Sequence, residues 1–399
     1  MVQTDARIRD EVRTGEIRLT EPTAIQKRLL DEYRLTQEYY EAYTRRICDE
    51  YADGRGVGAA LEAIEKYTGR TDVSLERDRK LVCDLLYTHN VLDFHYWEYF
   101  SYGMQGKSVA EWIEYLPNAL MTESYPMINT SRKALRIIGN KWECFQAFPK
   151  EHNREAMLVR SESDREAFLA FCKGKTGFAA KPVAGAKGRG VELVQLPTSA
   201  NPDDVFADLL EQGPVLCEEL IVSHESLRRL HPASVNTCRL FTYYDRDQGR
   251  SRIVCAWLKA GCNGANVDNA GAGGVLAALD VSSGVVTGDA SDEFGRTYAR
   301  HPNTGVIFRG FRVPQWDEAV KLALSLSIRM PKAPLIGWDL ALSADRGWQV
   351  VEANGKGQLS VMQVATKRGM RRELLESICW EDHRREASRA KKKTSSAKD

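Results

Sequence analysis

The segment from Gly337 to Gln358, which reads GWDLALSADRGWQVVEANGKGQ, restricts the fold more than any other part of the chain. It holds two short apolar runs typical of strands, and the turn residues ADRG predict a hairpin with its loop at 344–347. Antiparallel pairing then sets Asp339 opposite Glu352, with Cβ atoms about 5 Å apart. Two carboxylates at that spacing repel each other unless a cation or a proton compensates them. The same register pairs Ser343 with Trp348 and Ala341 with Val350.

Length and composition indicate a globular protein with more than one core. The chain has 399 residues, of which 43% are hydrophobic and 28% charged, and its formal net charge is +1. A near-neutral chain has no general attraction for nucleic acid or anionic lipid, so neither is expected as a partner. No run approaches the roughly 20 apolar residues of a membrane span, and the N-terminus has no signal-peptide core. We expect a cytoplasmic protein.

The nine cysteines are scattered along the chain, and no two of them form a CxxC pair. Most lie inside apolar runs. They are interpreted as buried free thiols in a reducing compartment and not as disulfides or zinc ligands. Their positions are Cys48, Cys83, Cys144, Cys172, Cys217, Cys238, Cys255, Cys262 and Cys379.

The character of the sequence changes along the chain. Between about Thr23 and Tyr115 the apolar spacing is helical, and it predicts helices at Ala24–Tyr51, Val57–Thr68, Leu75–Phe100 and Ser108–Tyr115. From about Lys141, short strands and glycine-rich loops alternate with helices, which favours an α+β or α/β catalytic region. The segment 381–399 is polar and basic, and is predicted to be a disordered tail.

The run FAAKPVAGAKGRGVELVQL predicts two strands, Phe178–Val183 and Val191–Leu196, joined by a loop of small residues. Glycines allow backbone N–H groups to close over an anion, so the loop resembles a flap that covers phosphate. It is not a P-loop, because no Gly-Lys-Ser/Thr follows. A plain mobile hairpin is the alternative, but Lys181 in an apolar strand favours an anion site. The flap residues concerned are Gly185, Lys187, Gly188, Arg189 and Gly190.

Other strand-like runs also contain single charged residues. In PVLCEELIVSHESL a strand ends in a carboxylate pair, and such an end can offer backbone groups to an adenine edge. Arg239 lies inside SVNTCRLFTYY, and Lys259 lies inside RIVCAWLKAGCNG. A single site for a polyphosphate and a divalent metal explains these charges together, whereas a purely structural protein would need a separate buried ion pair for each.

The order of these features resembles the ATP-grasp superfamily. It runs from Lys141 through Lys181 with its flap, EELI, Arg239 and Asp339 to Glu352-Ala-Asn354. The motifs SVNTCR, VDNAGAGGV, HPNTG and GWDLAL resemble more narrowly the sugar-transfer-associated branch, over roughly residues 140–363. The resemblance implies an α+β fold of two lobes that clasp ATP. We expect a helical region at 1–138 and a catalytic region at 139–380, with lobes at 139–222 and 223–380.

The resemblance also implies roles for individual residues, with ATP and Mg²⁺ as cofactors. Phosphate contacts fall to Lys141, Lys181 and the flap, adenine contacts to the backbone of Glu218 and Ile221, and ribose contacts to Glu225 or its neighbour His224. Glu219 is a further nucleotide-binding candidate. Arg239 would hold the terminal phosphate and would act in catalysis together with Lys181 and Lys259. Magnesium would be ligated by Asp339, Glu352 and Asn354. Asn269, His301 and Arg309 are candidates for the acceptor site, although their glycine-rich loops equally suit a supporting role.

The implied reaction is an ATP-dependent ligation of a carboxylate to an amine through an acyl phosphate. The product would be an amino acid joined to a sugar, a glycan precursor or a small peptide, in keeping with a role in polysaccharide biosynthesis. Two alternatives remain open: a phosphotransferase on the same scaffold, and a nucleotide-binding regulatory protein without catalysis.

Overall fold

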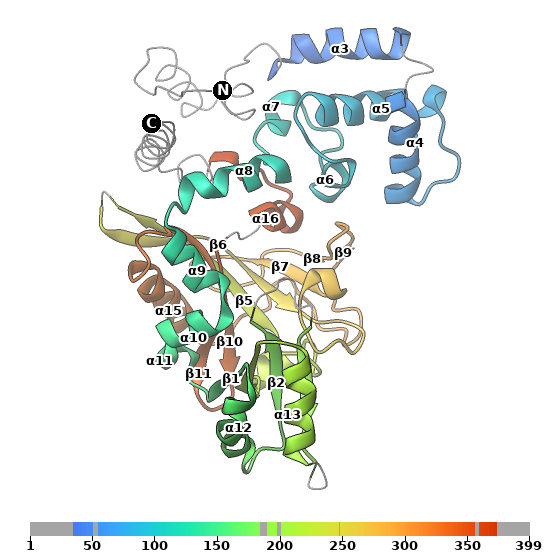
Figure 1. Cartoon of the computed structure of the whole chain (residues 1–399). Coiled ribbons are helices and arrows are strands. Elements are labelled where there is room, and N and C mark those ends of the chain that lie inside the picture. Colours follow the sequence, from blue (N-terminus) through green and yellow to red (C-terminus); the bar gives the residue numbers. More distant parts are fainter. Residues whose placement is uncertain are drawn as a thin grey trace, which may run out of the picture. The chain divides into compact units, whose positions relative to one another are not determined.

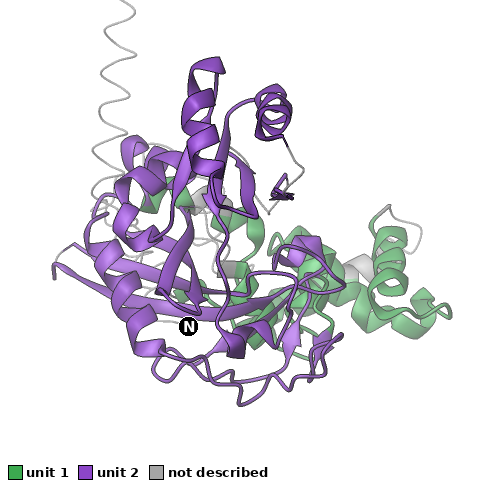
Figure 2. Ribbon diagram, turned by 90° about the horizontal axis from the view of Figure 1, so that it is seen from below, with its two compact units in different colours: residues 1–128, 294–296, 358–399 green, residues 129–293, 297–357 purple. Residues whose placement is uncertain are grey.

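The computed structural model of the chain describes residues 35–50, 55–183, 190–197, 201–246, 248–355 and 359–372 (Figure 1). The chain divides into two compact units (Figure 2), unit 1 with residues 1–128, 294–296 and 358–399, and unit 2 with residues 129–293 and 297–357. This division differs from the predicted boundary at 138. Residues 129–138 belong to unit 2 because Ile138 packs closely against Gly355, the residue after the last strand.

Unit 1 is helical in its described part, as predicted. Ser74 caps the backbone N–H of Arg77 and starts one helix, and a capping box of Ser108 with Glu111 starts another. A predicted helix at Leu75–Phe100 is broken in two, because the chain reverses at Asp93, which has a left-handed φ of 65°. The helices are α3 (Gln37–Glu50), α4 (Arg55–Thr68), α5 (Leu75–Asn90), α6 (Tyr96–Ser101), α7 (Val109–Trp112), α8 (Asn118–Ile128) and α16 (Leu359–Thr366).

An aromatic core holds the helices of unit 1 together. Tyr87, Tyr99, Tyr102 and Trp112 are fully buried, and the rings of Tyr87 and Tyr99 both pack against Trp112, that of Tyr99 edge to face. Glu98 is buried beside them, where its carboxylate accepts hydrogen bonds from the hydroxyl of Tyr102 and from two backbone N–H groups. Burial nevertheless raises the pKa of Glu98. These contacts are those of a structural core.

The cysteine prediction is confirmed in part. Six cysteines are free and buried, namely Cys144, Cys172, Cys217, Cys238, Cys255 and Cys262. The prediction is wrong for Cys83 on α5, which is disulfide-bonded. The cysteines nearest to Cys83 in the sequence are distant from it, so no local spacing marks its bond.

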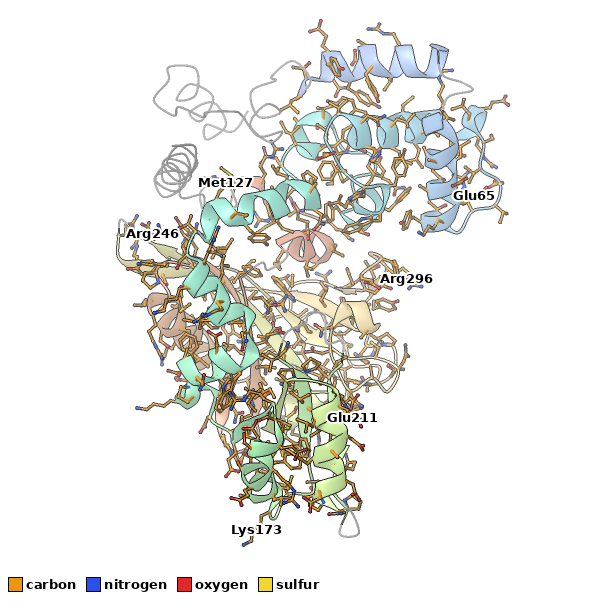
Figure 3. All side chains as sticks on the ribbon, in the orientation of Figure 1. Glu65, Met127, Lys173, Glu211, Arg246 and Arg296 are labelled. Atoms are coloured by element: carbon orange, nitrogen blue, oxygen red, sulfur yellow. The ribbon has the colours of Figure 1, made fainter. Side chains whose placement is uncertain are left out.

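The smaller sheet of unit 2 is antiparallel, with strand order β1-β4-β2-β3. Its strands are β1 (Ala156–Val159), β2 (Gly177–Pro182), β3 (Glu192–Gln195) and β4 (Val215–Glu219), and β2 and β3 correspond to the two predicted strands. Helices α12 (Arg165–Cys172) and α13 (Pro202–Glu211) bury Phe168 and Phe206 against Phe178 of the sheet. Figure 3 labels Lys173 and Glu211, which mark the ends of these two helices. A short 3₁₀ turn, η2 (Glu162–Asp164), precedes α12.

The larger sheet of unit 2 is also antiparallel, with strand order β11-β10-β5-β6-β7-β8-β9. Its strands are β5 (Thr237–Asp245), β6 (Arg250–Ala260), β7 (Val275–Leu279), β8 (Ala290–Ser291), β9 (Thr297–Tyr298), β10 (Leu335–Ser343) and β11 (Gly347–Asn354). Strand β10 is buried along its whole length, because β5 and β11 flank it and α15 (Trp316–Ile328) packs against the sheet. Two short turns complete the unit, α14 (Glu225–Arg228) and η3 (Ala270–Ala272).

Three helices come before the smaller sheet. They are α9 (Arg132–Gly139), α10 (Lys141–Ala147) and α11 (Pro149–His152), and they contact β11. The sequence predicted strands and loops alternating with helices from about Lys141, and α10 and α11 are the first helices of that region. Asn140 caps α10 through the N–H of Glu143, and Pro149 occupies the first turn of α11. Among the described residues, no helix is long and apolar enough to cross a membrane.

The predicted hairpin is present as β10 and β11, and Asp339 lies opposite Glu352. The other two predicted pairs are wrong, because Ser343 faces Gly347 and Ala341 faces Gln349. The loop covers 344–346 and not 344–347, while a β-bulge beyond Asp339 shifts the register back. The shorter loop moves the pairing by one residue and the bulge moves it back by one, so the predicted pair of Asp339 and Glu352 is still correct.

Candidate nucleotide site

A cavity of about 340 Å³ lies in unit 2 and is lined by residues of both sheets and of the connection that follows β4. The connection supplies Glu219 through Ser223, whose apolar members face the cavity together with Ala179 and Leu193. The charged lining residues are Lys141, Arg154, Lys181, Glu218, Glu219, Arg228, Lys259, Asp268, Asp339 and Glu352. An apolar wall beside a strongly charged wall is the usual character of a site for a polar ligand with an aromatic part.

Asp339 lies at the centre of the charged wall. Arg239 binds it through two hydrogen bonds of 2.6 Å, from Nε to Oδ1 and from Nη2 to Oδ2, and Lys259 Nζ lies 3.2 Å from Oδ2. Burial by itself would raise the pKa of Asp339, but Arg239 and Lys259 outweigh it and hold the pKa at about 2. Asp339 is therefore ionised at neutral pH, and two protein cations compensate its charge.

The position of Arg239 follows from the sheet. It lies directly opposite Asp339 on β5, and its guanidinium packs 5.6 Å from the ring centroid of Trp257 on β6. Arg239 on the neighbouring strand thus supplies the positive charge that Asp339 needs beside Glu352. An amide joins the group, since Asn354 Nδ2 lies 3.5 Å from Asp339 Oδ2.

Lys259 on β6 is buried between two carboxylates. Its Nζ lies 3.2 Å from Asp268 Oδ1, the same distance as from Asp339, and 3.4 Å from the side-chain oxygen of Asn269. Burial would lower the pKa of Lys259, but the two carboxylates raise it, so the ammonium stays charged. Asp268 and Asn269 belong to the connection between β6 and β7, within the motif VDNAGAGGV.

A second buried ion group lies across the cavity. Glu218 on β4 is fully buried between Arg154, whose Nη2 is 2.5 Å from Oε1, and Lys181 on β2, which pairs with Oε2. Burial would raise the pKa of Glu218, but Arg154 and Lys181 lower it to about 2. Arg154 also donates a 2.7 Å hydrogen bond to the carbonyl of Val350 on β11, so it joins the smaller sheet to the larger one.

The connection after β4 is fixed from both sides. Glu219 accepts two hydrogen bonds of 2.7 Å from Arg346 in the β10–β11 loop, and these lower the pKa of Glu219 to about 2. The backbone N–H of Ala344 donates to the carbonyl of Val222. Ile221 lines the cavity between these two anchors. The predicted adenine contacts Glu218 and Ile221 and the further candidate Glu219 therefore all line the cavity, with the Glu218 carboxylate turned toward cations.

Lys141 and Glu352 face each other on the remaining side of the cavity. Lys141 is the first residue of α10, and its Nζ lies 3.7 Å from Glu352 Oε1 on β11. Both side chains retain some exposure, 16% for Lys141 and 29% for Glu352. Both are more accessible than Asp339, Lys259 and Glu218.

Not every predicted site residue lines the cavity. His224 caps α14 and Glu225 begins it with an exposed side chain, and neither is among the lining residues. His301 is buried, where its Nε2 bonds the carbonyl of Gly261 at 2.8 Å, and Arg309 is exposed beside Asp289. Asn269 does line the cavity. Of the flap, only Gly190 is described, with a left-handed φ of 74°; Gly185, Lys187, Gly188 and Arg189 lie outside the described residues.

Four charged residues of the site were not predicted, namely Arg154, Arg228, Arg346 and Asp268. Arg154 lies in a polar segment between a helix and a strand, where nothing in the sequence marks it. Arg346 lies in the predicted turn, where an arginine is ordinary. Asp268 had a usable signal, because it adjoins Asn269 in the glycine-rich motif that the sequence already marks as part of the acceptor region.

Comparison with known proteins agrees with this geometry. The family described as sugar-transfer associated ATP-grasp matches residues 121–379, a span that contains every lining residue of the cavity. Among curated proteins, none matches significantly.

The solved structures that match the chain include three ligases, each at low similarity. The ATP-grasp ligase PsnB with a minimal precursor has 13% identity and a TM-score of 0.39, over 63% of this chain and 62% of that chain. The D-alanine-D-alanine ligase from Coxiella burnetii has 7% identity and a TM-score of 0.39, over 65% and 62%. The L-amino acid ligase from Bacillus licheniformis has 11% identity and a TM-score of 0.36, over 58% of this chain and 43% of that chain. This chain thus spans less than two thirds of each, and similarity this low assigns no reaction.

Proposed function

The chain belongs to the sugar-transfer associated ATP-grasp family, and from this premise we propose that it is an ATP-dependent, ADP-forming ligase that joins a carboxylate to an amine. The observation that carries the proposal is the arrangement of the cavity. Two lysines and an opposed carboxylate pair line the same space: Lys181 binds Glu218 on the smaller sheet, and Lys141 lies 3.7 Å from Glu352, which faces Asp339 on the larger sheet. A ligand with several negative charges and its own cation fits that distribution.

The cavity fits ATP in size and in lining. About 340 Å³ is within the usual range for ligand pockets. Ala179, Leu193 and Ile221 offer apolar surface for a base, and the backbone of 219–222 lies beside them. Lys141 and Lys181 would hold phosphate oxygens, since both already face carboxylates across the same space. The proposed nucleotide contacts come from two lysines, the flap and the end of β4 with the connection after it, and the ribose would be held by His224 or Glu225. They are Lys141, Lys181, Gly185, Lys187, Gly188, Arg189, Gly190, Glu218, Glu219 and Ile221.

The donor set also fits magnesium. Asp339, Glu352 and Asn354 offer oxygen atoms from adjacent strands, and Mg²⁺ usually takes one or two carboxylates together with substrate phosphates. No group of three or more His, Cys, Asp or Glu side chains suited to a metal is found in the described part of the chain. These residues therefore suit an ion shared with the nucleotide more than an all-protein cage. Bound there, Mg²⁺ would neutralise phosphate charge and polarise the transferring phosphoryl group.

The residues of the chain would act mainly by position and charge. Arg239 and Lys259 are buried cations that bind Asp339, and both would stabilise negative charge on a phosphoryl group in transfer to the substrate carboxylate; of the two, Lys259 lines the cavity and Arg239 lies behind Asp339 in the sheet. Lys181 would do the same from the smaller sheet. The amine would then attack the acyl phosphate and release phosphate. Asn269, which lines the cavity next to Lys259, is the best placed of the acceptor candidates, ahead of His301 and Arg309.

The proposed substrates are small molecules, a carboxylate and an amine, with an amino acid and a sugar or glycan precursor as the leading pair because of the family to which the chain belongs. A phosphotransferase on the same scaffold is the second candidate function. It would use the same ATP clamp but would form a stable phosphate ester on a hydroxyl. The experiment must therefore distinguish the two products.

Hydroxylamine capture tests the ligase reaction directly. The enzyme is incubated with ATP, Mg²⁺, hydroxylamine and a panel of amino acids, sugar acids and small peptides. We expect a hydroxamate together with ADP for at least one acid, because hydroxylamine intercepts an acyl phosphate but not a phosphate ester. A product that keeps its phosphate, with ADP but without hydroxamate or free phosphate, would establish the phosphotransferase instead.

A further inference from the structure

The buried charges around Lys259 form a closed group. Asp268 and Asp339 flank Lys259 at 3.2 Å each, and Arg239 binds both oxygens of Asp339. Two cations thus face two carboxylates, and all four side chains are at most 12% exposed. Buried charges are tolerated when each has an opposite partner, and the loss of one partner is costly.

Asp268 itself is held by the start of β5. Its Oδ2 accepts hydrogen bonds from the backbone N–H of Thr237 at 2.8 Å and from the hydroxyl of Thr237 at 2.6 Å. Its other oxygen is left to face Lys259. One carboxylate oxygen therefore fixes the side chain, and the other one orients the ammonium group.

The connection that carries Asp268 is closely packed at both ends. A Cβ atom at Gly261 would lie 2.9 Å from the carbonyl oxygen of Val267, and one at Gly274 would lie 2.6 Å from that of Asp268. His231 Nε2 bonds the carbonyl of Ala265 at 3.1 Å between these ends. These contacts leave the backbone of the connection little room to move, so the fold itself sets the position of Asp268 beside Lys259.

We propose that Asp268 is a positioning residue that holds Lys259 while Asp339 exchanges its protein cations for the metal ion. This rests on the proposed function, in which Asp339 is a magnesium ligand. When Asp339 turns to a metal, Lys259 loses one of its two carboxylates. Asp268 keeps the ammonium group of Lys259 paired and in place. The buried charge of Lys259 therefore stays compensated when Asp339 binds the metal. Without the Asp268 charge, Lys259 has only Asp339 as a carboxylate partner in this group and competes with the metal for it.

The test measures metal binding and not turnover. Mn²⁺ is titrated into the full chain with a non-hydrolysable ATP analogue, and free Mn²⁺ is followed by electron paramagnetic resonance. We expect Asp268→Asn to weaken Mn²⁺ binding about tenfold, because Asn keeps an acceptor for Thr237 but lacks the charge. Affinity for the analogue without metal should stay within about twofold. Asp208→Asn, an exposed position on α13, is the charge-matched control and should leave both affinities unchanged.

Asp268→Ala separates the charge from the hydrogen bonds to Thr237. It should show the same Mn²⁺ defect as Asp268→Asn together with a lower melting temperature. A defect in Asp268→Ala without one in Asp268→Asn would mean that Asp268 only supports the loop, and would overturn the inference. If the unmodified chain binds the analogue with Mn²⁺ and Asp268→Asn binds equally well, the inference alone fails. If the unmodified chain shows no metal-dependent binding, the proposed function fails with it.

Discussion

At the scale of single residues, the site is built from charges that are already paired. Asp339 is compensated by Arg239 and Lys259, and Glu218 by Arg154 and Lys181. The compensating cation that the opposed carboxylates require is thus supplied to Asp339 by the protein itself, before any metal binds. Magnesium and ATP would enter a site whose ion pairs must rearrange, which ties ligand binding to the electrostatics of the folded chain.

Removal of the Asp339 charge should destabilise the ligand-free protein. In Asp339→Asn the buried Arg239 and Lys259 keep their charges but lose a shared carboxylate, and we expect a loss of about 3 kcal/mol in the free energy of unfolding. Glu352→Gln is the matched change across the hairpin. Glu352 is partly exposed and only 3.7 Å from Lys141, so the loss should be below about 1 kcal/mol. Urea unfolding of both variants measures the difference, and equal stabilities would contradict the charge assignment.

At the scale of elements, the sequence alone predicted strands β2 and β3, the β10–β11 hairpin and most helices of unit 1, because their apolar spacing is regular. It failed where a local signal was weak or misleading. The bulge in the hairpin leaves no mark in the residue pattern, and the caps at Asn140 and Ser131 start short helices for which no individual prediction was made. Within the site, Arg154 could not be predicted because its partner Glu218 is distant in sequence.

The β6–β7 connection gives a prediction at this scale. A Cβ atom at Gly274 would meet three backbone carbonyl oxygens at 2.6 to 2.9 Å, and Gly274 has no room to move away from them. We expect Gly274→Ala to lower the free energy of unfolding by roughly 2 kcal/mol or more and to weaken ATP binding, since Asp268 lies in the same loop. Gly288→Ala is the control, because its nearest neighbour would be 3.9 Å away. Thermal unfolding with and without ATP measures both effects. A Gly274→Ala protein with the same melting temperatures as Gly288→Ala would contradict the close packing around Gly274.

At the scale of the whole molecule, the family match confirms the predicted α+β ATP-grasp fold with a helical region before it. The boundaries of the two compact units could not be read from the sequence. Residues 359–372 join the N-terminal helices through α16, where Gln363 exchanges hydrogen bonds with the backbone of Leu116. Such long-range pairing has no counterpart in local periodicity.

The stability of the chain should depend on pH in a defined window. Asp339 and Glu218 have pKa values near 2 in the folded protein, below their ordinary values of 3.8 and 4.5. Folded pKa values that are depressed stabilise the protein above the unfolded values, and this stabilisation is lost as pH falls toward 2. We expect a loss on the order of 2 to 3 kcal/mol per carboxyl as pH falls from about 5 toward 2. Burial lowers the pKa of His152 to about 4, so His152 should add a further loss that begins as pH falls below the ordinary histidine value of 6.5. Urea unfolding against pH measures it, and Asp339→Asn should show a shallower decline. A stability that rises below pH 4 would contradict the pairing.

The central claim is that the cavity of unit 2 binds ATP between Lys181 and the carboxylates of the β10–β11 hairpin. Calorimetric titration of Mg·ATP into the full chain and into Lys181→Ala tests it most directly, with Lys173→Ala, an exposed lysine at the end of α12 (Figure 3), as the control for lost charge. Glu218 keeps Arg154 in Lys181→Ala, so the fold should hold. The account predicts one ATP per chain, an affinity about tenfold lower in Lys181→Ala and an unchanged affinity in Lys173→Ala. An unmodified chain that does not bind ATP, or a Lys181→Ala protein that binds it equally well, would contradict the account.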